Sequence, residues 1–449
     1  MKPGRAIKIF PARSSASQGG SLLIIVLWII FGLVSVTLYF AHTMSFELRA
    51  SDNRVAGIEA EQAIQGAACY MSLVLSNSTS PGALPDPQTF QASEVAVGDA
   101  KFWLIGRTNN DDAPTTAHFG VVDEASKLNI NAATADMLAL LPRMTPDLAA
   151  SIVAWRSAAT NTSSGGAQSD TYMRLQPPYM CKNAPFETVD ELRLIYQMTT
   201  DILYGEDANL NGILDANEND GDVTPPSDNQ DGRLDPGILN YVTVYSHEPS
   251  TGTNGTARVS LATTNQQQIL TVLTNYFDTT RAQEILQAAG AGPFTSPLQF
   301  YVRSKMTPAE FQQIEGDIRG TNIVGLVNVN TASAAVLACL PGLDSGKAAQ
   351  LVAARQSNPN TENSIAWVST ALTDTQTINQ VGPWITGKSY QFTTDVAAVG
   401  HYGRGYRRTR FVFDTTQGTP TIVYRQDLSH LGWALGKETR QTLLAKEGP

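Results

Sequence analysis

One stretch of the chain places oxygen-bearing side chains at the spacing of a calcium-binding loop. Residues 207–218 read DANLNGILDANE, with acidic or amide side chains at positions 1, 3, 5, 9 and 12 and glycine at position 6. Calcium takes six to eight oxygen ligands, and the glycine permits the sharp turn that gathers them. We therefore predict a structural Ca²⁺ bound by the carbonyl of Ile213 and by the side chains of Asp207, Asn209, Asn211, Asp215 (directly or through water) and Glu218 (with both oxygens).

The segment that follows this loop is also acidic. Residues 229–235, NQDGRLD, repeat half of the pattern, which suggests a second ion at Asn229, Asp231 and Asp235. A solvated acidic linker is the alternative for both segments. Because two prolines (residues 225–226) follow the first loop closely, a helix-loop-helix sensor is excluded. An ion that closes one long acidic loop, residues 205–240, is favoured instead.

The other reactive side chains form no catalytic pattern. Five histidines share no motif with a nucleophile or a metal partner, and Ser-x-x-Lys, Gly-x-Ser-x-Gly and phosphate-loop patterns are absent from the sequence. Three cysteines, Cys69, Cys181 and Cys339, are too few for a disulfide framework. We therefore expect no enzymatic activity. Whether Cys181, which lies in a loop, forms a disulfide stays open.

The acidic loop lies between two copies of an internal repeat. Residues 128–156 and 327–355 align without a gap and share 13 of 29 residues. Each copy predicts a short N-x-N strand, a helix, a tight turn after Leu-Pro and a second, alanine-rich helix. With their tails the two units cover 128–192 and 327–372, and a weaker third copy covers 259–300.

These units resemble helix-hairpin-helix modules, which often bind DNA through turn glycines that expose backbone N–H groups to a phosphate. The turns here read Arg143-Met144-Thr145 and Gly342-Leu343-Asp344, so the first has no glycine. Neither unit has an excess of cations, and the whole chain carries a formal net charge of −10. A structural scaffold is therefore favoured, and DNA binding is the alternative.

The N-terminal segment predicts a membrane helix. Four basic residues and no acid precede Gly19-Gly20, and the run from Leu22 to Ala41 is apolar. No proline interrupts the chain between Pro11 and Pro81, so the helix should continue through an amphipathic half to about residue 75. The alternative interpretation of this segment is an ordinary signal anchor. The basic leader followed by glycine and a long helix is similar to the N-terminus of type IV pilins and pseudopilins.

Alternating apolar stretches flank the helical region on both sides. They occur at 101–105 and 117–122 before it, and at 390–399, 409–413 and 421–424 after it. We predict an α+β fold: a long pilin-like N-terminal helix and an antiparallel sheet split between residues 76–127 and 380–449. A large helical domain, 128–379, is inserted into the sheet domain. The length of 449 residues allows two or three domains.

Taken together, the split sheet, the pilin-like helix and the motifs DEASKLNIN (123–131) and VNVNTA (327–332) resemble the general secretion pathway protein K family. These proteins are minor pseudopilins of type II secretion systems. The resemblance implies cleavage by prepilin peptidase after Gly19 or Gly20. It also implies a single-pass inner-membrane protein with a cytoplasmic N-terminus and a periplasmic C-terminal domain. The implied partners are the I-type and J-type minor pseudopilins, the major pseudopilin and the inner-membrane secretion platform; nucleic acid is not among them.

The fifth mature position carries an unusual residue. Most pilins have glutamate there, whereas this chain has Ile24, or Ile25 if the cut follows Gly20. The family resemblance implies that the missing carboxylate, which normally neutralises a neighbouring N-terminus, suits a subunit at the filament tip. The competence-type pseudopilin whose hairpins bind DNA is the alternative function.

Overall fold

The computed structural model describes residues 19–78, 80–107, 117–157, 165–252, 255–263, 265–357 and 363–446. The chain divides into two compact units, residues 1–55 and 56–449. Residues 1–18 of the predicted basic leader lie outside the described residues. The two glycines of the predicted cleavage site, Gly19 and Gly20, are the first residues of the first helix.

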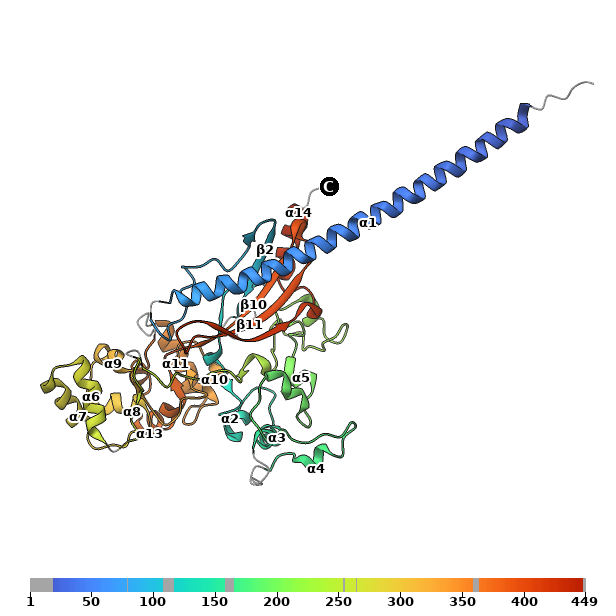
Figure 1. The fold of residues 1–449 in the computed structure, drawn as a ribbon. Coiled ribbons are helices and arrows are strands. Elements are labelled where there is room, and N and C mark those ends of the chain that lie inside the picture. Colours follow the sequence, from blue (N-terminus) through green and yellow to red (C-terminus); the bar gives the residue numbers. More distant parts are fainter. Residues whose placement is uncertain are drawn as a thin grey trace, which may run out of the picture. The chain divides into compact units, whose positions relative to one another are not determined.

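Helix α1 runs without interruption from Gly19 to Ser76 (Figure 1). Among the described residues, it contains the one segment that is long and apolar enough to cross a bilayer, and that segment is not buried. This fits a single-pass membrane anchor. From Ala56 onward the helix buries one face, as predicted. The fully buried residues of this face recur at three-to-four spacing: Ala56, Ala60, Ala63, Ile64, Ala67 and Met71.

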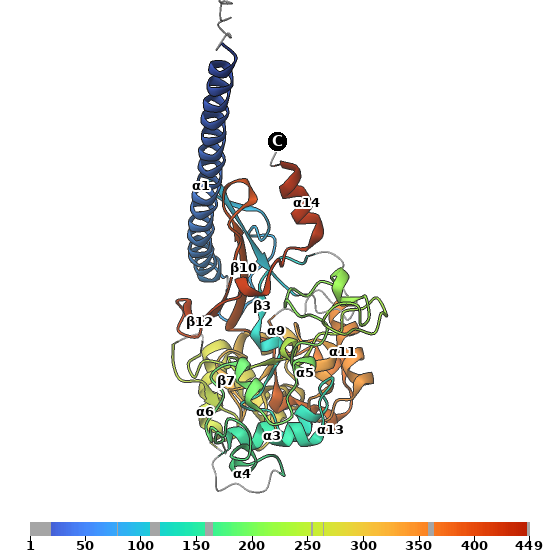
Figure 2. The ribbon, with the colours of Figure 1, turned by 90° about the vertical axis from the view of Figure 1, so that its right-hand side faces the viewer.

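That buried face of α1 covers a six-stranded antiparallel sheet in the C-terminal unit (Figure 2). The strand order is β1-β2-β10-β11-β12, and β3 pairs with β10. Aromatic residues of the sheet, such as Phe102, Phe392 and Phe411, pack against the alanine-rich helix. The strands are β1 (Val95–Val97), β2 (Ala100–Ile105), β3 (Val122–Asp123), β10 (Gln391–Val399), β11 (Arg407–Asp414) and β12 (Thr421–Asp427).

The opposite face of the sheet is covered by the C-terminal segment. Trp103, Ile105 and Val399 pack with Leu435 and Leu443, and Leu443 lies on helix α14 (Gly436–Lys446). Strands β2 and β10 are neighbours although almost three hundred residues separate them in sequence. The predicted α+β fold, with a long N-terminal helix and an antiparallel sheet, is confirmed.

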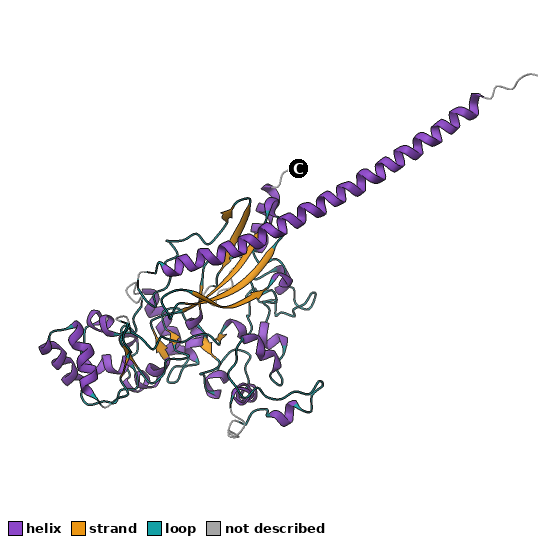
Figure 3. Ribbon diagram, viewed as in Figure 1, coloured by secondary structure: helices purple, strands orange, loops and turns teal. Residues whose placement is uncertain are grey.

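The chain between β3 and β10 is mostly helices and loops with a few short strands (Figure 3), and it forms three consecutive modules with one plan. Each module starts with a two-residue strand, continues into a helical hairpin and ends with a strand that pairs in parallel with the first. Module 1 has β4 (Leu128–Asn129), α2 (Ala135–Ala139), α3 (Pro146–Arg156) and β5 (Val242–Thr243). Module 2 has β6 (Val259–Ser260), α6 (Gln266–Tyr276), α7 (Thr279–Ala289) and β7 (Ile318–Arg319). Module 3 has β8 (Val327–Asn328), α10 (Ala334–Ala338), α11 (Ser345–Ser357) and β9 (Ile385–Thr386).

Shorter helices fill the space between hairpins and closing strands. They are α4 (Ser169–Tyr172), α5 (Thr200–Tyr204), α8 (Pro297–Ser304), α9 (Pro308–Ile314), α12 (Val368–Ala371) and α13 (Thr375–Val381). One apolar core runs through all three modules. One predicted strand differs from the structure. The stretch 117–122 contributes a single bridge, from Phe119 to Ile105, and the start of β3. The stretch 241–246 supplies β5, which pairs with β4 in module 1.

Candidate functional site

The predicted calcium loop closes upon itself around Asp207. The Oδ1 atom of Asp207 accepts a hydrogen bond from Asn211 N at 2.9 Å, and its Oδ2 atom accepts one from Gly212 N at 3.0 Å. Gly212 has a φ of +71°, a backbone conformation that favours glycine. The first and sixth positions of the pattern are therefore joined by the turn that the sequence predicts.

The other predicted ligands lie around the same turn. The Asp215 carboxylate accepts hydrogen bonds from the amide groups of Asn209 (2.8 Å) and Asn211 (2.9 Å). The two oxygens of Glu218 accept from the backbone N–H groups of Ala208 and Asp215. Within the described ranges, no group of three His, Cys, Asp or Glu side chains gathers closely enough to hold a metal ion. In this conformation the loop carboxylates bind amide groups of the loop.

Electrostatics nevertheless favour a cation at this site. Glu218 is 1% exposed, and burial followed by repulsion from Asp207 and Asp215 raises its pKa to about 8. Asp207 and Asp215 thus repel Glu218 electrostatically, and Arg107 forms an ion pair with Asp207. Hard divalent cations bind carboxylate and amide oxygens, and such an ion would remove the repulsion. The donor set therefore fits Ca²⁺.

Two arginines of the sheet domain hold the loop from outside. Arg107, after β2, donates to Asp207 Oδ2 (2.8 Å) and to the carbonyl of Leu210 (2.6 Å). Arg408 on β11 is fully buried; it forms a bidentate ion pair with Asp395 and also donates to the carbonyls of Asn209 and Leu210. Sequence reasoning missed both arginines, because no motif links them to a loop that is distant in sequence.

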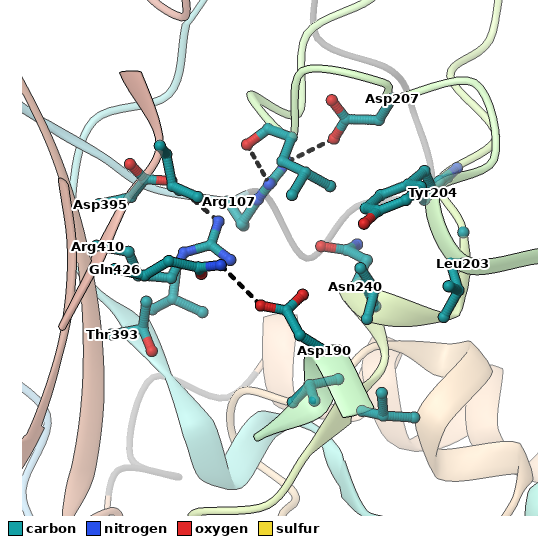
Figure 4. A pocket seen from close by; sticks show the side chains of 18 of the residues that line it. Arg107, Asp190, Leu203, Tyr204, Asp207, Asn240, Thr393, Asp395, Arg410 and Gln426 are labelled. Carbon is teal, nitrogen blue, oxygen red and sulfur yellow. Dashed lines mark hydrogen bonds and ion pairs between the residues drawn. The ribbon is translucent and has the colours of Figure 1, made fainter. Parts of the chain in front are cut away.

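A pocket of about 100 Å³ lies between the sheet and the start of this loop (Figure 4). Charged groups line it, and they are paired with one another: Arg107 with Asp207, and Arg410 with Asp395. Gln426 on β12 donates to Asp190 across it at 2.7 Å. The pocket thus joins the sheet to module 1 through paired polar groups.

The predicted second ion site is dispersed in the structure. Asn229 and Asp231 accept hydrogen bonds from backbone N–H groups two residues further along the chain. The carboxylate of Asp235 instead pairs with Arg143 at 2.7 Å, and its backbone N–H donates to buried Glu206. The second ion stays a prediction.

The hairpin turns of modules 1 and 3 have equivalent backbones. Arg143 and Gly342, which align in the repeat, both have positive φ, at +60° and +85°. The Arg143 side chain pairs with Asp201, which precedes the acidic loop, and with Asp235, which lies within it. In module 3 the carbonyl of Gly342 accepts from Lys347 Nζ at 3.1 Å. The cations beside both turns, Arg143 and Lys347, are thus engaged by groups of their own chain.

Buried carboxylates join the modules to the sheet. Asp123, on β3, accepts hydrogen bonds from the hydroxyls of Thr331 and Ser389, and burial raises its pKa to about 6. Its neighbour Glu124 accepts from the hydroxyls of Thr243 and Thr393. These two adjacent carboxylates therefore link the sheet to the closing strand of module 1 and to residues that follow the two strands of module 3.

Parts of the chain are similar to known protein families and to solved structures. Two family models, both described as type II secretion system protein K, match residues 125–204 and 327–381. No curated protein matches the chain significantly. Among solved structures, the crystal structure of the GspK-GspI-GspJ complex from the type 2 secretion system of enterotoxigenic Escherichia coli covers 82% of this chain and 97% of that chain. The sequence identity is 11% and the TM-score is 0.40.

The two matched ranges contain the hairpins of modules 1 and 3, residues 125–131 of the first motif and the whole of the second motif. The first range also includes α5, which leads into the acidic loop. Both parts of the chain therefore match the type II secretion system protein K family, the family that the sequence resemblance indicated.

Proposed function

We propose that this protein caps the tip of the periplasmic pseudopilus of a type II secretion system and helps to initiate its assembly for the export of folded proteins. The observation that carries this proposal is the apolar residue at position 24. In pilins with an acid at the fifth mature position, the carboxylate pairs with the N-terminal amine of a neighbouring subunit. A chain with Ile24 lacks that carboxylate, so it offers no partner to the N-terminal amine of another subunit. An amine left unpaired in lipid is costly, which disfavours a subunit above this one.

The ectodomain supports the same role. The three modules, which share one apolar core, add a large body to the pilin-like sheet. A body of this size on the outer side of a pilin-like sheet hinders another subunit from stacking above it. The partners that follow are the I-type and J-type minor pseudopilins, with the major pseudopilin below them.

The membrane arrangement follows from the same proposal. Prepilin peptidase removes the basic leader after Gly19 or Gly20, and α1 anchors the protein in the inner membrane. The basic leader keeps the N-terminus in the cytoplasm, so that the C-terminal domain lies in the periplasm. N-terminal sequencing of membrane-extracted protein identifies the cut.

We also propose that the acidic loop binds a structural Ca²⁺ through Asp207, Asn209, Asn211, Ile213, Asp215 and Glu218. The closed turn at Gly212 and the raised pKa of Glu218 support it. The ion would hold the loop against Arg107 and Arg408 and so fix module 1 on the sheet.

Electron microscopy of elongated pseudopili tests the tip position. When the major pseudopilin is overproduced, a gold-labelled antibody against the ectodomain should mark one end of each filament. An antibody against the major pseudopilin, as the control, should mark the whole length. Labelling of the ectodomain along the filament would contradict a cap.

A further inference from the structure

The pocket between the sheet and module 1 lies at the junction of two parts of the ectodomain, a common place for ligand sites. Its volume is about 100 Å³. In Figure 4 Tyr204 and Asn240 of module 1 lie on one side of it, and Arg410 and Gln426 of the sheet lie on the other. A closed cavity of about 150 Å³ holds a six-membered carbon ring. This pocket therefore accepts most of one such ring.

The charged side chains that line the pocket are paired with one another. Each carboxylate of the lining forms an ion pair with a lysine or arginine of the lining: Glu124 with Lys127, Asp190 with Arg193, Asp207 with Arg107 and Asp395 with Arg410. A charged ligand would have to break one of these pairs or lose its hydration without a partner. The pocket therefore favours an uncharged ligand.

Other polar groups of the pocket have no partner. Within the residues that the structure describes, the carboxamide of Asn240 and the hydroxyls of Tyr245 and Tyr424 form no hydrogen bond. The buried Nε atom of Arg410 also has none. Polar groups in protein interiors are normally hydrogen-bonded. Because an amide and a hydroxyl can each donate and accept, a matching ligand does both as well.

Tyrosine rings and aliphatic side chains supply the apolar part of the pocket. The ring centroids of Tyr245 and Tyr424 lie 5.8 Å apart, and Leu203 and Leu239 also line the pocket. The lining thus combines flat apolar surfaces with unpaired donors and acceptors. A sugar ring matches both properties, since its C–H faces are apolar and its edge carries hydroxyls.

We propose that this pocket binds one residue of an uncharged sugar, whose hydroxyls bond to Asn240, Tyr245 and Tyr424 and whose ring lies against the tyrosines. Asn240 belongs to module 1 and Tyr424 to β12, so the sugar bridges the two parts of the ectodomain. The proposal depends neither on the calcium site nor on the tip position. The same sugar ring can come from a free sugar or from the end of a glycan chain.

Saturation-transfer difference NMR tests the pocket on the full-length protein in a detergent without a sugar headgroup. Glucose, galactose and N-acetylglucosamine are the probes, and at least one of them should receive saturation from the protein. The double variant Asn240→Ala/Tyr245→Phe removes two partners and should raise the Kd of that sugar about tenfold or more, equivalent to about 1.4 kcal/mol. Tyr424→Phe should weaken binding from the side of the sheet. Tyr402→Phe, the same change at an exposed tyrosine outside the pocket, is the control.

Three results would overturn the proposal. If none of the sugars receives saturation, the pocket takes no such ligand. If the double variant and Tyr424→Phe bind as tightly as the native protein, the sugar binds elsewhere. If the charged analogues glucosamine and glucuronate bind as tightly as glucose, the pocket does not select an uncharged ligand. A tetrasaccharide of the sugar that binds separates the two sources: equal or tighter binding indicates the end of a glycan chain, and weaker binding indicates a free sugar.

Discussion

Two arginines at equivalent repeat positions hold the turn between strand and hairpin. Arg156 donates to the carbonyls of Ile130 and Ala133 in module 1. Arg355 donates to the carbonyls of Val329 (3.1 Å) and Ala332 (2.6 Å) in module 3. Both are mostly buried, which lowers the pKa of each guanidinium. The repeat thus keeps this arginine because it satisfies two carbonyls of the turn.

Replacing the module 3 arginine should destabilise the ectodomain. Arg355→Gln leaves two carbonyls without their donor, at a cost of roughly 1 to 3 kcal/mol. The midpoint of urea unfolding, followed by tryptophan fluorescence, should fall accordingly. Arg174→Gln, at a position whose side chain is 83% exposed, should leave it unchanged. Equal midpoints for Arg355→Gln and the native protein would refute this role.

Glu315 should make stability depend on pH. It is 5% exposed, and its Oε2 atom has no hydrogen-bond partner among the described residues. Burial raises its pKa to about 7, above the value of about 4.5 in the unfolded chain. The folded state therefore holds the proton more tightly, so stability falls as pH rises from about 4.5 to 7.

The variant Glu315→Gln tests this at the same position. It should be more stable than the native protein at pH 8, by roughly 1 to 3 kcal/mol, and should lose the part of the slope between about pH 4.5 and 7 that Glu315 contributes. Unfolding midpoints across this pH range provide the measurement. An unchanged slope would show that Glu315 titrates normally.

Among the elements, the acidic loop is the one whose stability should depend most on a bound ion. Chelation with EDTA should lower the melting temperature by a few degrees, because an ion at about 100 times its Kd stabilises by about 3 kcal/mol. Asp207→Ala should remove the response to chelator. Since this variant also loses the Arg107 ion pair, the response and not the absolute melting temperature is the readout. Asp136→Ala, at an exposed carboxylate on α2, should respond like the native protein.

The elements also show how far sequence reasoning reaches. Helix α1 was predicted to within two residues at each end, because periodic burial and the absence of proline are local signals. The hairpins of modules 1 and 3 were visible through their repeated residues. The parallel pairing that closes these modules, of β4 with β5 and of β8 with β9, was not, since two residues that pair across more than fifty others carry no local signal of their partner.

The residues of the candidate site also fall into two groups, those that the sequence predicts and those that only the structure shows. The ligand spacing of the acidic loop is continuous in sequence and could be read directly. Arg107, Arg408 and the Arg143–Asp235 pair depend on tertiary contacts between distant segments, so a single sequence could not reveal them. Helix α14 was missed because its buried anchor, Leu443, is a single residue in a largely polar segment.

For the whole molecule, the apolar position near the start of α1 should determine where the subunit sits. Ile24→Glu restores the acid typical of filament-body subunits and should raise the number of copies per pseudopilus, measured by quantitative immunoblotting of sheared filaments. Ile25→Glu is the matched control, and the substitution that acts also identifies the cut as after Gly19 or Gly20. If neither changes the copy number, the residue does not set the position.

The parallel strand pairs that close the three modules have an evolutionary consequence. Each module enters and leaves through neighbouring strands, so its two ends lie about 5 Å apart. A gene can lose or duplicate such a unit while the flanking chain still joins across one strand spacing. Ectodomains of this kind can therefore change size in whole steps, and the sheet that carries them stays intact.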